Sequence, residues 1–136
     1  MPVVLNYNAT VVTPTVNGTS IPIPLAPGGV GVAAVVVNVP NSNQRFVEIK
    51  ATVGLQGTSG IGGVLFVLFR DGVEIYRFRQ DLLNGFNEYA LVTLQAVDGN
   101  ATVGPHTYTL GAQIQTPSSL VAAAVGPIDI SATVIG

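Results

Sequence analysis

Two strand-like runs on either side of a tight turn form the clearest pattern of apolar and polar positions in the chain. Val64–Phe69 contains only large apolar residues, and Val73–Arg79 mixes apolar residues with charged ones. The dipeptide Asp71-Gly72 between them is typical of a type I′ turn, because glycine readily adopts the positive φ that this turn requires. The pattern therefore predicts a β-hairpin over residues 64–79.

The first strand of this hairpin is apolar on both faces. Alternate side chains of a strand point to opposite faces, so Val64, Phe66 and Leu68 share one face and the apolar residues between them share the other. An antiparallel sheet usually covers one face with its own core and leaves the other face in water. We therefore expect a partner subunit to cover the second apolar face. The expected trimer interface consists of Val64, Phe66, Leu68, Val35 and Val37.

Six further segments have strand-like patterns and are separated by glycine, proline and short polar residues. They are Gly31–Val39, Arg45–Leu55, Glu88–Val97, Thr107–Gln115, Leu120–Val125 and Ile128–Ile135. A glycine-rich segment, Gln56–Gly63, predicts a loop before the hairpin. Because no stretch has a clear helical period, the eight segments predict an all-β fold, a jelly-roll β-sandwich.

The N-terminal segment, residues 1–27, is uncharged, aliphatic and interrupted by five prolines. Proline lacks the amide donor of a sheet ladder, and flexible linkers are normally polar. The residues leave two interpretations open, an extended arm in an apolar groove of a neighbouring subunit, or one or two edge strands of the domain. Our working hypothesis is the arm, with a connector at residues 1–27 and a sandwich domain at residues 28–136. The expected connector contacts are Val3, Val4, Leu5, Tyr7, Val11, Val12, Ile21, Ile23 and Leu25.

The distribution of charge narrows the classes of partner. Charged residues make up 9% of the chain, against about 25% in typical domains, and none precedes Arg45. Five basic residues and a net charge of −2 provide no positive surface for nucleic acid or anionic lipid. No apolar run reaches the length of about 18 residues that a membrane-spanning helix needs. We therefore expect neither nucleic-acid binding nor membrane insertion, and instead association between neutral surfaces of identical subunits.

The residues also argue against an enzyme and against a metal site. The chain has no cysteine and one histidine, His106, which follows a Gly-Pro turn signal. Thr58–Gly63 is similar to a phosphate-binding loop but lacks its Lys-Ser/Thr ending. The turn carboxylates, among them Asp71 and Asp98, lack the spacing of a calcium loop, so we expect them in solvent. We therefore predict no catalytic residue, no cofactor and no metal, and place the arginines of the hairpin at a subunit boundary or on a solvent-facing rim.

Parts of the C-terminal two thirds resemble a known family. Gly63–Val73 is similar to its apolar strand, polar turn and Gly-Val sequence, and Thr107–Leu110 followed by Leu120–Ile135 resembles its alanine-rich penultimate strand and Ile/Val-rich last strand. The family is the trimeric tumour-necrosis-factor/complement-type jelly roll, in the bacterial version found on collagen-like glycoproteins of the spore surface, the exosporium. The uncharged segment at residues 1–27, in place of a collagen stretch, resembles the subunits of thin endospore appendages.

The resemblance implies a structural function. We expect a self-assembling homotrimer whose N-terminal connectors join trimers into a fibre on an extracellular spore surface, with a spore-surface anchoring protein as a further partner. Head-to-tail contacts that do not close on themselves produce such filaments. Two alternatives stay open. A carbohydrate- or protein-recognition head would use the loops Pro40–Gln44, Gly57–Gly63 and Asn84–Asn87, and a phage or viral decoration protein would carry the same fold on a virion.

Overall fold

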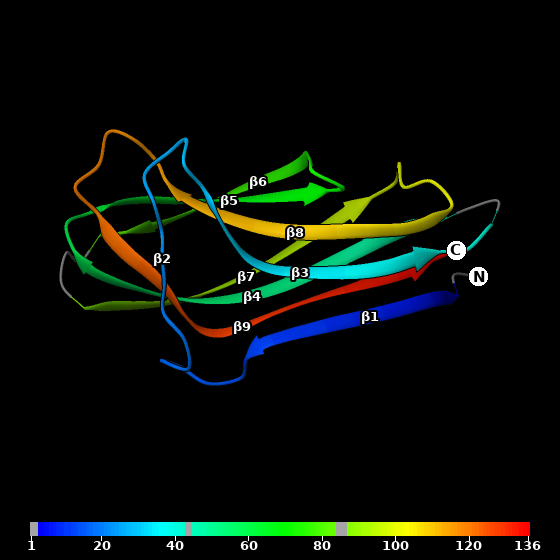
Figure 1. Cartoon of the computed structure of the whole chain (residues 1–136), viewed down its shortest axis with the longest axis horizontal. Coiled ribbons are helices and arrows are strands. Elements are labelled where there is room, and N and C mark those ends of the chain that lie inside the picture. Colours follow the sequence, from blue (N-terminus) through cyan, green and yellow to red (C-terminus); the bar gives the residue numbers. More distant parts are fainter. Residues whose placement is uncertain (1–2, 43–44, 84–86) are drawn as a thin grey trace.

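A computed structural model describes residues 3–42, 45–83 and 87–136 of the chain. These residues form two antiparallel β-sheets packed face to face, and no helix occurs among them (Figure 1). The strands are β1 (Val4–Thr13), β2 (Ile21–Pro22), β3 (Val30–Val39), β4 (Phe46–Ser59), β5 (Gly62–Arg70), β6 (Val73–Leu82), β7 (Glu88–Asp98), β8 (Gly104–Ile114) and β9 (Val121–Ile135). The predicted all-β sandwich is therefore confirmed.

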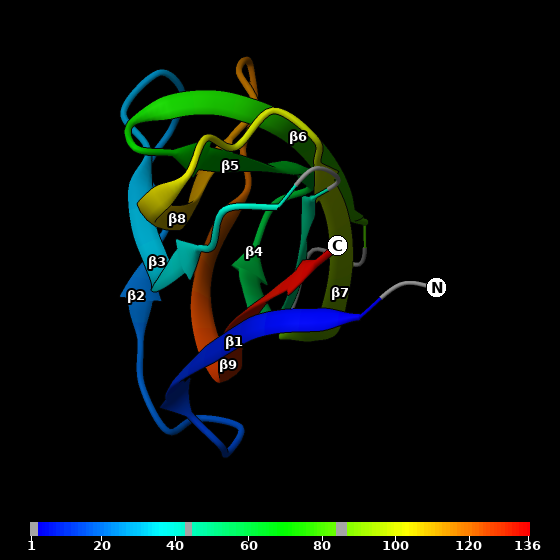
Figure 2. The ribbon, with the colours of Figure 1, turned by 90° about the vertical axis from the view of Figure 1, so that its right-hand side faces the viewer.

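The strands alternate between the two sheets along the chain. One sheet has the order β1-β9-β4-β7, with β2 also paired to β9, and the other has the order β3-β8-β5-β6. The turned view in Figure 2 shows the two layers from the end at which the C-terminus lies. From β2 onwards every connection except the β5–β6 hairpin crosses from one sheet to the other, an arrangement compatible with the expected jelly roll. In that hairpin Asp71 and Gly72 both have positive φ, 52° and 87°, which confirms the predicted type I′ turn.

The core lies between the two sheets, and one chain supplies all of it. On β5, Val64, Phe66 and Leu68 have no exposed surface, and on β3, Val35 and Val37 are at most 2% exposed. These five residues are the expected trimer interface, and that expectation is wrong. A side chain that is already enclosed by the opposing sheet of its own chain has no surface left for a partner.

The outer face of β5 shows why a strand with two apolar faces did not need a second subunit. Val67 is only 5% exposed, and Leu65 and Phe69 are half-buried. The cross-strand neighbour of Val67 on β6 is Arg77, and the aliphatic part of an arginine side chain covers apolar surface well. The second apolar face is thus covered mainly by side chains of its own sheet.

The N-terminal segment belongs to the sandwich of its own chain, so the connector arm and the boundary between residues 27 and 28 are also corrected. β1 pairs with β9 from Val4 to Thr13, and β2 pairs with a second part of β9. Of the expected connector residues, Ile23 is buried and Leu5 and Ile21 pack against the core. The remaining six are exposed on the single chain: Val3, Val4, Tyr7, Val11, Val12 and Leu25. The edge-strand interpretation is the one observed, because β9 offers an unpaired edge to the aliphatic segment.

Two asparagines hold β1 in place. On β1, the side-chain amides of Asn6 and Asn8 donate hydrogen bonds across the open side of the sandwich to the backbone carbonyls of Asn38 and Val36 on β3, at 2.8 and 2.7 Å. The side-chain oxygen of each asparagine accepts a hydrogen bond from the amide of the next residue, at 2.9 Å. This Asn clasp, Asn6 and Asn8, satisfies backbone groups on the outward edges of both sheets, which otherwise invite pairing with other chains.

The sequence also misplaces some strand ends. Gln56–Gly63 was expected to be a loop, but β4 continues to Ser59 and β5 begins at Gly62. The two expected C-terminal strands are one long strand, β9, which passes through Gly126-Pro127 at a register shift against β4. Gly126 has a φ of 102°, a conformation that glycine adopts at little cost, so the chain bends there without ending the strand.

We predict that the Asn clasp stabilises the fold. The double substitution Asn6→Ala and Asn8→Ala should lower the free energy of unfolding by about 1–3 kcal/mol, because it removes the side-chain hydrogen bonds of an otherwise solvated edge. Asn38→Ala is the matched control, since it removes an exposed side chain but keeps the carbonyl that the clasp uses. Urea unfolding curves measure both effects; equal stability of all three proteins would contradict the role of the clasp.

Candidate functional site

The outer face of the β1-β9-β4-β7 sheet, which we call face A, carries few charged side chains among its described residues. Exposed apolar side chains on three strands of this face include Val4, Tyr7, Val11, Phe46, Tyr89, Leu91 and Val97. Among the described residues of the face, the charged side chains are Asp129 and the pair Glu48 and Lys50, which lie 3.3 Å apart. Face A can therefore be covered by another apolar surface at a small electrostatic cost.

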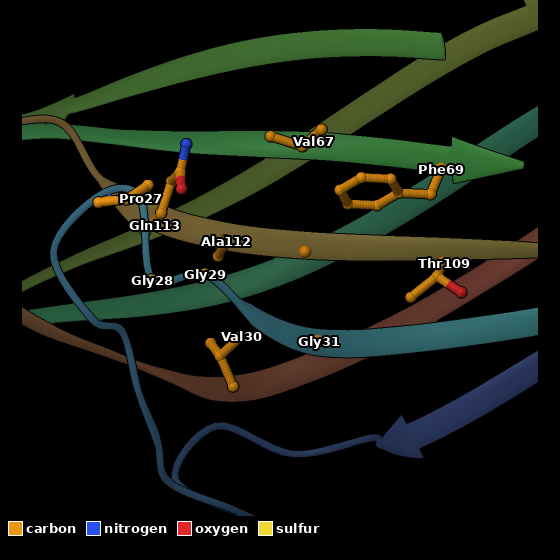
Figure 3. A pocket seen from close by; sticks show the side chains of 11 residues that line it. Pro27, Gly28, Gly29, Val30, Gly31, Val67, Phe69, Thr109, Ala112 and Gln113 are labelled. Carbon is orange, nitrogen blue, oxygen red and sulfur yellow. The ribbon is translucent and has the colours of Figure 1, made fainter. Parts of the chain in front are cut away.

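The outer face of the β3-β8-β5-β6 sheet, face B, carries a shallow hollow of 290 Å³. Figure 3 shows its two sides, Val67 and Phe69 along β5 and the segment from Pro27 to Gly31 that enters β3. Between them runs β8, which contributes Thr109, Gly111 and Gln113. The hollow thus combines an aromatic ring, a polar amide and a hydroxyl group, a combination that suits a small ligand with both apolar and hydrogen-bonding groups.

Two glycines create this hollow. Gly31 and Gly111 are cross-strand partners on β3 and β8. A Cβ atom on Gly31 would meet no other atom within 4 Å, so any side chain there would fill the open space. A Cβ atom on Gly111 would lie 3.4 Å from Cε2 of Phe69, which shows how closely the ring lies over the strand. Larger residues at these positions would therefore remove the hollow without changing the core.

The arginines of β6 pair within the chain. Arg77 contacts Glu74 at 2.8 Å, and Arg79 contacts Asp81 at 2.7 Å, with all four side chains about half exposed. A β-bulge in the hairpin shifts the register between Leu68 and Phe69, which brings Glu74 to the face of Arg77 although the strand period places them on opposite faces. The solvent-facing rim is thus the observed alternative, and such exposed pairs contribute little to stability.

A buried polar cluster joins the two sheets at the end of the sandwich where β5 ends. Asp98 of β7 is 5% exposed, and its carboxylate accepts hydrogen bonds from Nη1 of Arg70 at 2.6 and 2.7 Å. The hydroxyl of Tyr108, fully buried on β8, donates to the same carboxylate at 2.8 Å. The expectation that Asp98 lies in solvent is therefore wrong, since the carboxylate bridges the two layers.

The electrostatics of this cluster favour the charged carboxylate. Burial alone raises the pKa of Asp98, but the hydrogen bonds from Arg70 and Tyr108 outweigh burial and hold the pKa below its usual range. Burial, together with the hydrogen bond to Asp98, raises the pKa of Tyr108 far above its usual value. No signal in the sequence identifies this cluster, because its three members come from three different strands and meet only when the two sheets pack.

The only histidine also has a structural environment. His106 on β8 is 8% exposed; Nδ1 lies 2.6 Å from the carboxylate of Asp71 and Nε2 lies 2.7 Å from the carbonyl of Thr102. The Thr102 hydroxyl is 3.4 Å from Nε2. Because the carbonyl occupies Nε2, the ring is not arranged to activate that hydroxyl as a nucleophile. Among the described residues, no group of three His, Cys, Asp or Glu side chains is placed to hold a metal ion.

The loops expected for a recognition head do not form one surface. Phe46, just after the loop at Pro40–Gln44, pairs with Ile135 at one end of β9, whereas Ser59, within Gly57–Gly63, pairs with Val121 at the other end. Figure 1 shows the two loops at opposite ends of the sandwich. Residues 43–44 and 84–86 of the expected loops lie outside the described residues. The described part of the chain contains no helix that could span a membrane.

No protein-family model and no curated protein sequence matches the chain. Among solved structures, dimeric latent PorU from Porphyromonas gingivalis is 9% identical with a TM-score of 0.51, and the match covers 97% of this chain and 13% of that chain. The arabinose-bound MgGH51 α-L-arabinofuranosidase is 13% identical with a TM-score of 0.42, over 98% of this chain and 23% of that chain. The likeness to PorU concerns the fold alone, and the second likeness is too low to support an argument.

We predict that Asp98→Asn lowers the free energy of unfolding at pH 7 by about 2 kcal/mol, because Arg70 loses the charge of its partner. The folded-state pKa of Asp98 lies below the unfolded value of about 3.9. The stabilisation is therefore present above that unfolded value and is lost as the pH falls through the folded-state pKa. Urea unfolding between about pH 2 and pH 7, roughly the range over which carboxylates titrate, should show the two proteins converging in acid. Asp129→Asn, on exposed face A, is the control and should change stability by less than about 0.5 kcal/mol.

Proposed function

We propose that this chain is a structural, self-assembling subunit without a catalytic role, and that face A is the surface between copies. The proposed interface is therefore the outer face of the β1-β9-β4-β7 sheet, and not the buried residues of β3 and β5 that the sequence suggested. The proposal keeps the extracellular, spore-type location and the trimeric fibre that the family resemblance implies, with the anchoring protein as a further partner and a virion as the alternative location.

The size of face A supports a second copy as its occupant. Four strands spaced about 4.8 Å apart, each about ten residues long at about 3.3 Å per residue, present roughly 600 Å². A stable interface buries about 800 Å² on each partner, so face A with its bordering loops has about the necessary area. No smaller surface would cover Tyr7 on β1 and Leu91 on β7, which lie on opposite edges of this sheet.

The placement of charge supports the same occupant. Face B carries the ion pairs of β6, whereas the described charges of face A are Asp129 and one internal pair. Arginine and glutamate rows on a solvated face favour the soluble state of a subunit. Threonine, serine and valine side chains, which dominate face A between its aromatic residues, can be desolvated against the same residues of another copy.

We predict reversible, concentration-dependent association of the purified chain. Leu91→Lys should raise the dissociation constant by about tenfold or more, because it places a charge within the apolar contact, on the β7 side of face A. Val36→Lys is the matched control, since Val36 is 51% exposed on face B and Leu91 is 62% exposed on face A. Sedimentation equilibrium measures both. A wild-type chain that stays monomeric over the whole accessible concentration range would overturn the proposal.

The hollow on face B favours a second candidate function, recognition of a carbohydrate. Phe69 provides a ring against which a sugar can pack, and Thr109 and Gln113 provide hydrogen-bonding groups within the same hollow. Its volume of 290 Å³ is at the lower limit of about 300 Å³ for small-molecule sites. The location differs from the loops expected from the sequence, because the hollow depends on the two glycines of β3 and β8.

If this second function holds, binding on a glycan array should be weaker in Phe69→Ala and unchanged in Phe46→Ala. The two substitutions remove the same side chain from face B and face A respectively. The loss of the ring should weaken binding by about tenfold, the value of roughly one aromatic contact. An array without any bound glycan, or equal binding by both variants, would count against the hollow as a carbohydrate site.

A further inference from the structure

His106 connects two loops at the end of the sandwich where β5 ends. Its Nδ1 atom lies 2.6 Å from Oδ2 of Asp71, in the β5–β6 turn, and its Nε2 atom lies 2.7 Å from the backbone oxygen of Thr102, in the β7–β8 loop. The ring is 8% exposed. The histidine therefore lies between the turn and the loop, and each ring nitrogen contacts one of them.

Both contacts require the ring to donate. A carboxylate and a backbone carbonyl have no proton to give, so each nitrogen must carry its own hydrogen, and only the imidazolium ion carries two. In the neutral ring, one nitrogen would direct a lone pair at an oxygen less than 3 Å away. The Thr102 hydroxyl lies 3.4 Å from Nε2, which is too far to replace the contact with the carbonyl.

The surrounding charges agree with this geometry. Burial and the positive charge of Arg70 lower the pKa of His106, but the hydrogen bonds to Asp71 and Thr102 outweigh them and raise it above its usual value. Arg70 is itself paired with Asp98. The amide of Thr107 donates to Oδ1 of Asp71 at 2.9 Å, so the carboxylate is held in place beside the ring, and its pKa is lowered.

We propose that protonated His106 is a pH-sensitive latch between the β5–β6 turn and the β7–β8 loop, and that the latch opens when the ring loses its proton. The sign follows from linkage. A histidine whose pKa is higher in the folded than in the unfolded chain contributes its full stabilisation below the unfolded value of about 6.5 and loses it as the pH rises through the folded-state pKa. The latch is therefore closed in mild acid and opens on the alkaline side, and it does not depend on the self-assembly proposed above.

The latch has a defined point of release. Asp71 remains tied to Thr107 after the ring deprotonates, because its second oxygen accepts the amide of that residue. A carboxylate is a stronger acceptor than a neutral carbonyl, so Nδ1 keeps its hydrogen beside Asp71 and Nε2 loses the one it shares with Thr102. Loss of the proton therefore weakens the contact to Thr102 rather than the turn. At the other side of the loop, Asn100 remains tied to Asp98 through its amide, at 3.1 Å. Ala101 is also held, since it is 7% exposed and its carbonyl accepts a hydrogen bond from Nε of Arg45 at 3.4 Å. The segment released is therefore Thr102 and Val103, just before β8.

The test is a pH titration followed by NMR, in which the only histidine of the chain gives a single ring signal. We expect the ring to titrate above the value of an unfolded histidine, and the carbonyl carbon shift of Thr102 to change with the same midpoint. The carbonyl of Val97, which accepts a hydrogen bond from Tyr76, is the internal reference and should not change. Cleavage of the β7–β8 loop by a protease active over the whole pH range should become about tenfold faster once the latch opens, the effect of one lost charged hydrogen bond.

Two variants separate the latch from general stability. Asp71→Asn removes the charge that favours the imidazolium, so the midpoint should move to lower pH, and asparagine tolerates the positive φ of 52° at this position. Thr102→Ala keeps the backbone carbonyl and should leave the midpoint unchanged. A ring that titrates at or below the unfolded value, a Thr102 carbonyl that does not follow it, or a midpoint that Asp71→Asn leaves in place would each overturn the latch.

Discussion

The burial of two apolar sheet faces against each other is the constraint on which the rest of this structure depends. The inner strands of the two sheets contribute about every second residue to the interior, and the largest of these, such as Phe66, Tyr108 and Ile130, have no exposed surface. Because one chain supplies both layers, the core is complete without a partner. The outer faces are then free to differ from each other, and they do so in charge, in flatness and in the presence of a hollow.

Polar side chains close the sandwich where its sheets end. On one side, the Asn clasp satisfies backbone groups of β1 and β3. At the end where β5 stops, Asp98 links β7 to β5 and β8 through Arg70 and Tyr108. These groups specify which edges meet, since a buried or bridging polar atom tolerates only the geometry that satisfies it. Hydrophobic burial drives the two layers together, and the polar contacts fix their register.

The division of the surface gives the proposed functions a physical basis. The uncharged N-terminal segment contributes exposed tyrosine and valine side chains to face A rather than extending as a connector. In the proposed self-association its neutrality would let face A be covered by another copy, even though the segment is a strand of its own domain. The ion pairs of β6 and the hollow lie on face B. The histidine lies at the end of the sandwich where β5 ends. The proposed assembly, ligand recognition and response to pH would thus involve separate parts of the molecule.

The sequence by itself determined the all-β class, the β5–β6 hairpin and most strand positions, because these follow from local properties, the alternation of apolar residues and the backbone preference of Asp71-Gly72. The tertiary structure alone decided which surface covers each apolar face. The pattern of β5 shows that both of its faces must be covered. It cannot show that β4 and β9 cover the inner face, or that neighbouring side chains cover the outer face. In the same way, the aliphatic composition of residues 1–27 indicates that the segment must pair with an edge strand, but it does not identify that strand as β9. The polar sites depend on contacts between the two sheets, as between Asp98 on β7 and its partners Arg70 on β5 and Tyr108 on β8, and such contacts exist only once the sheets have packed.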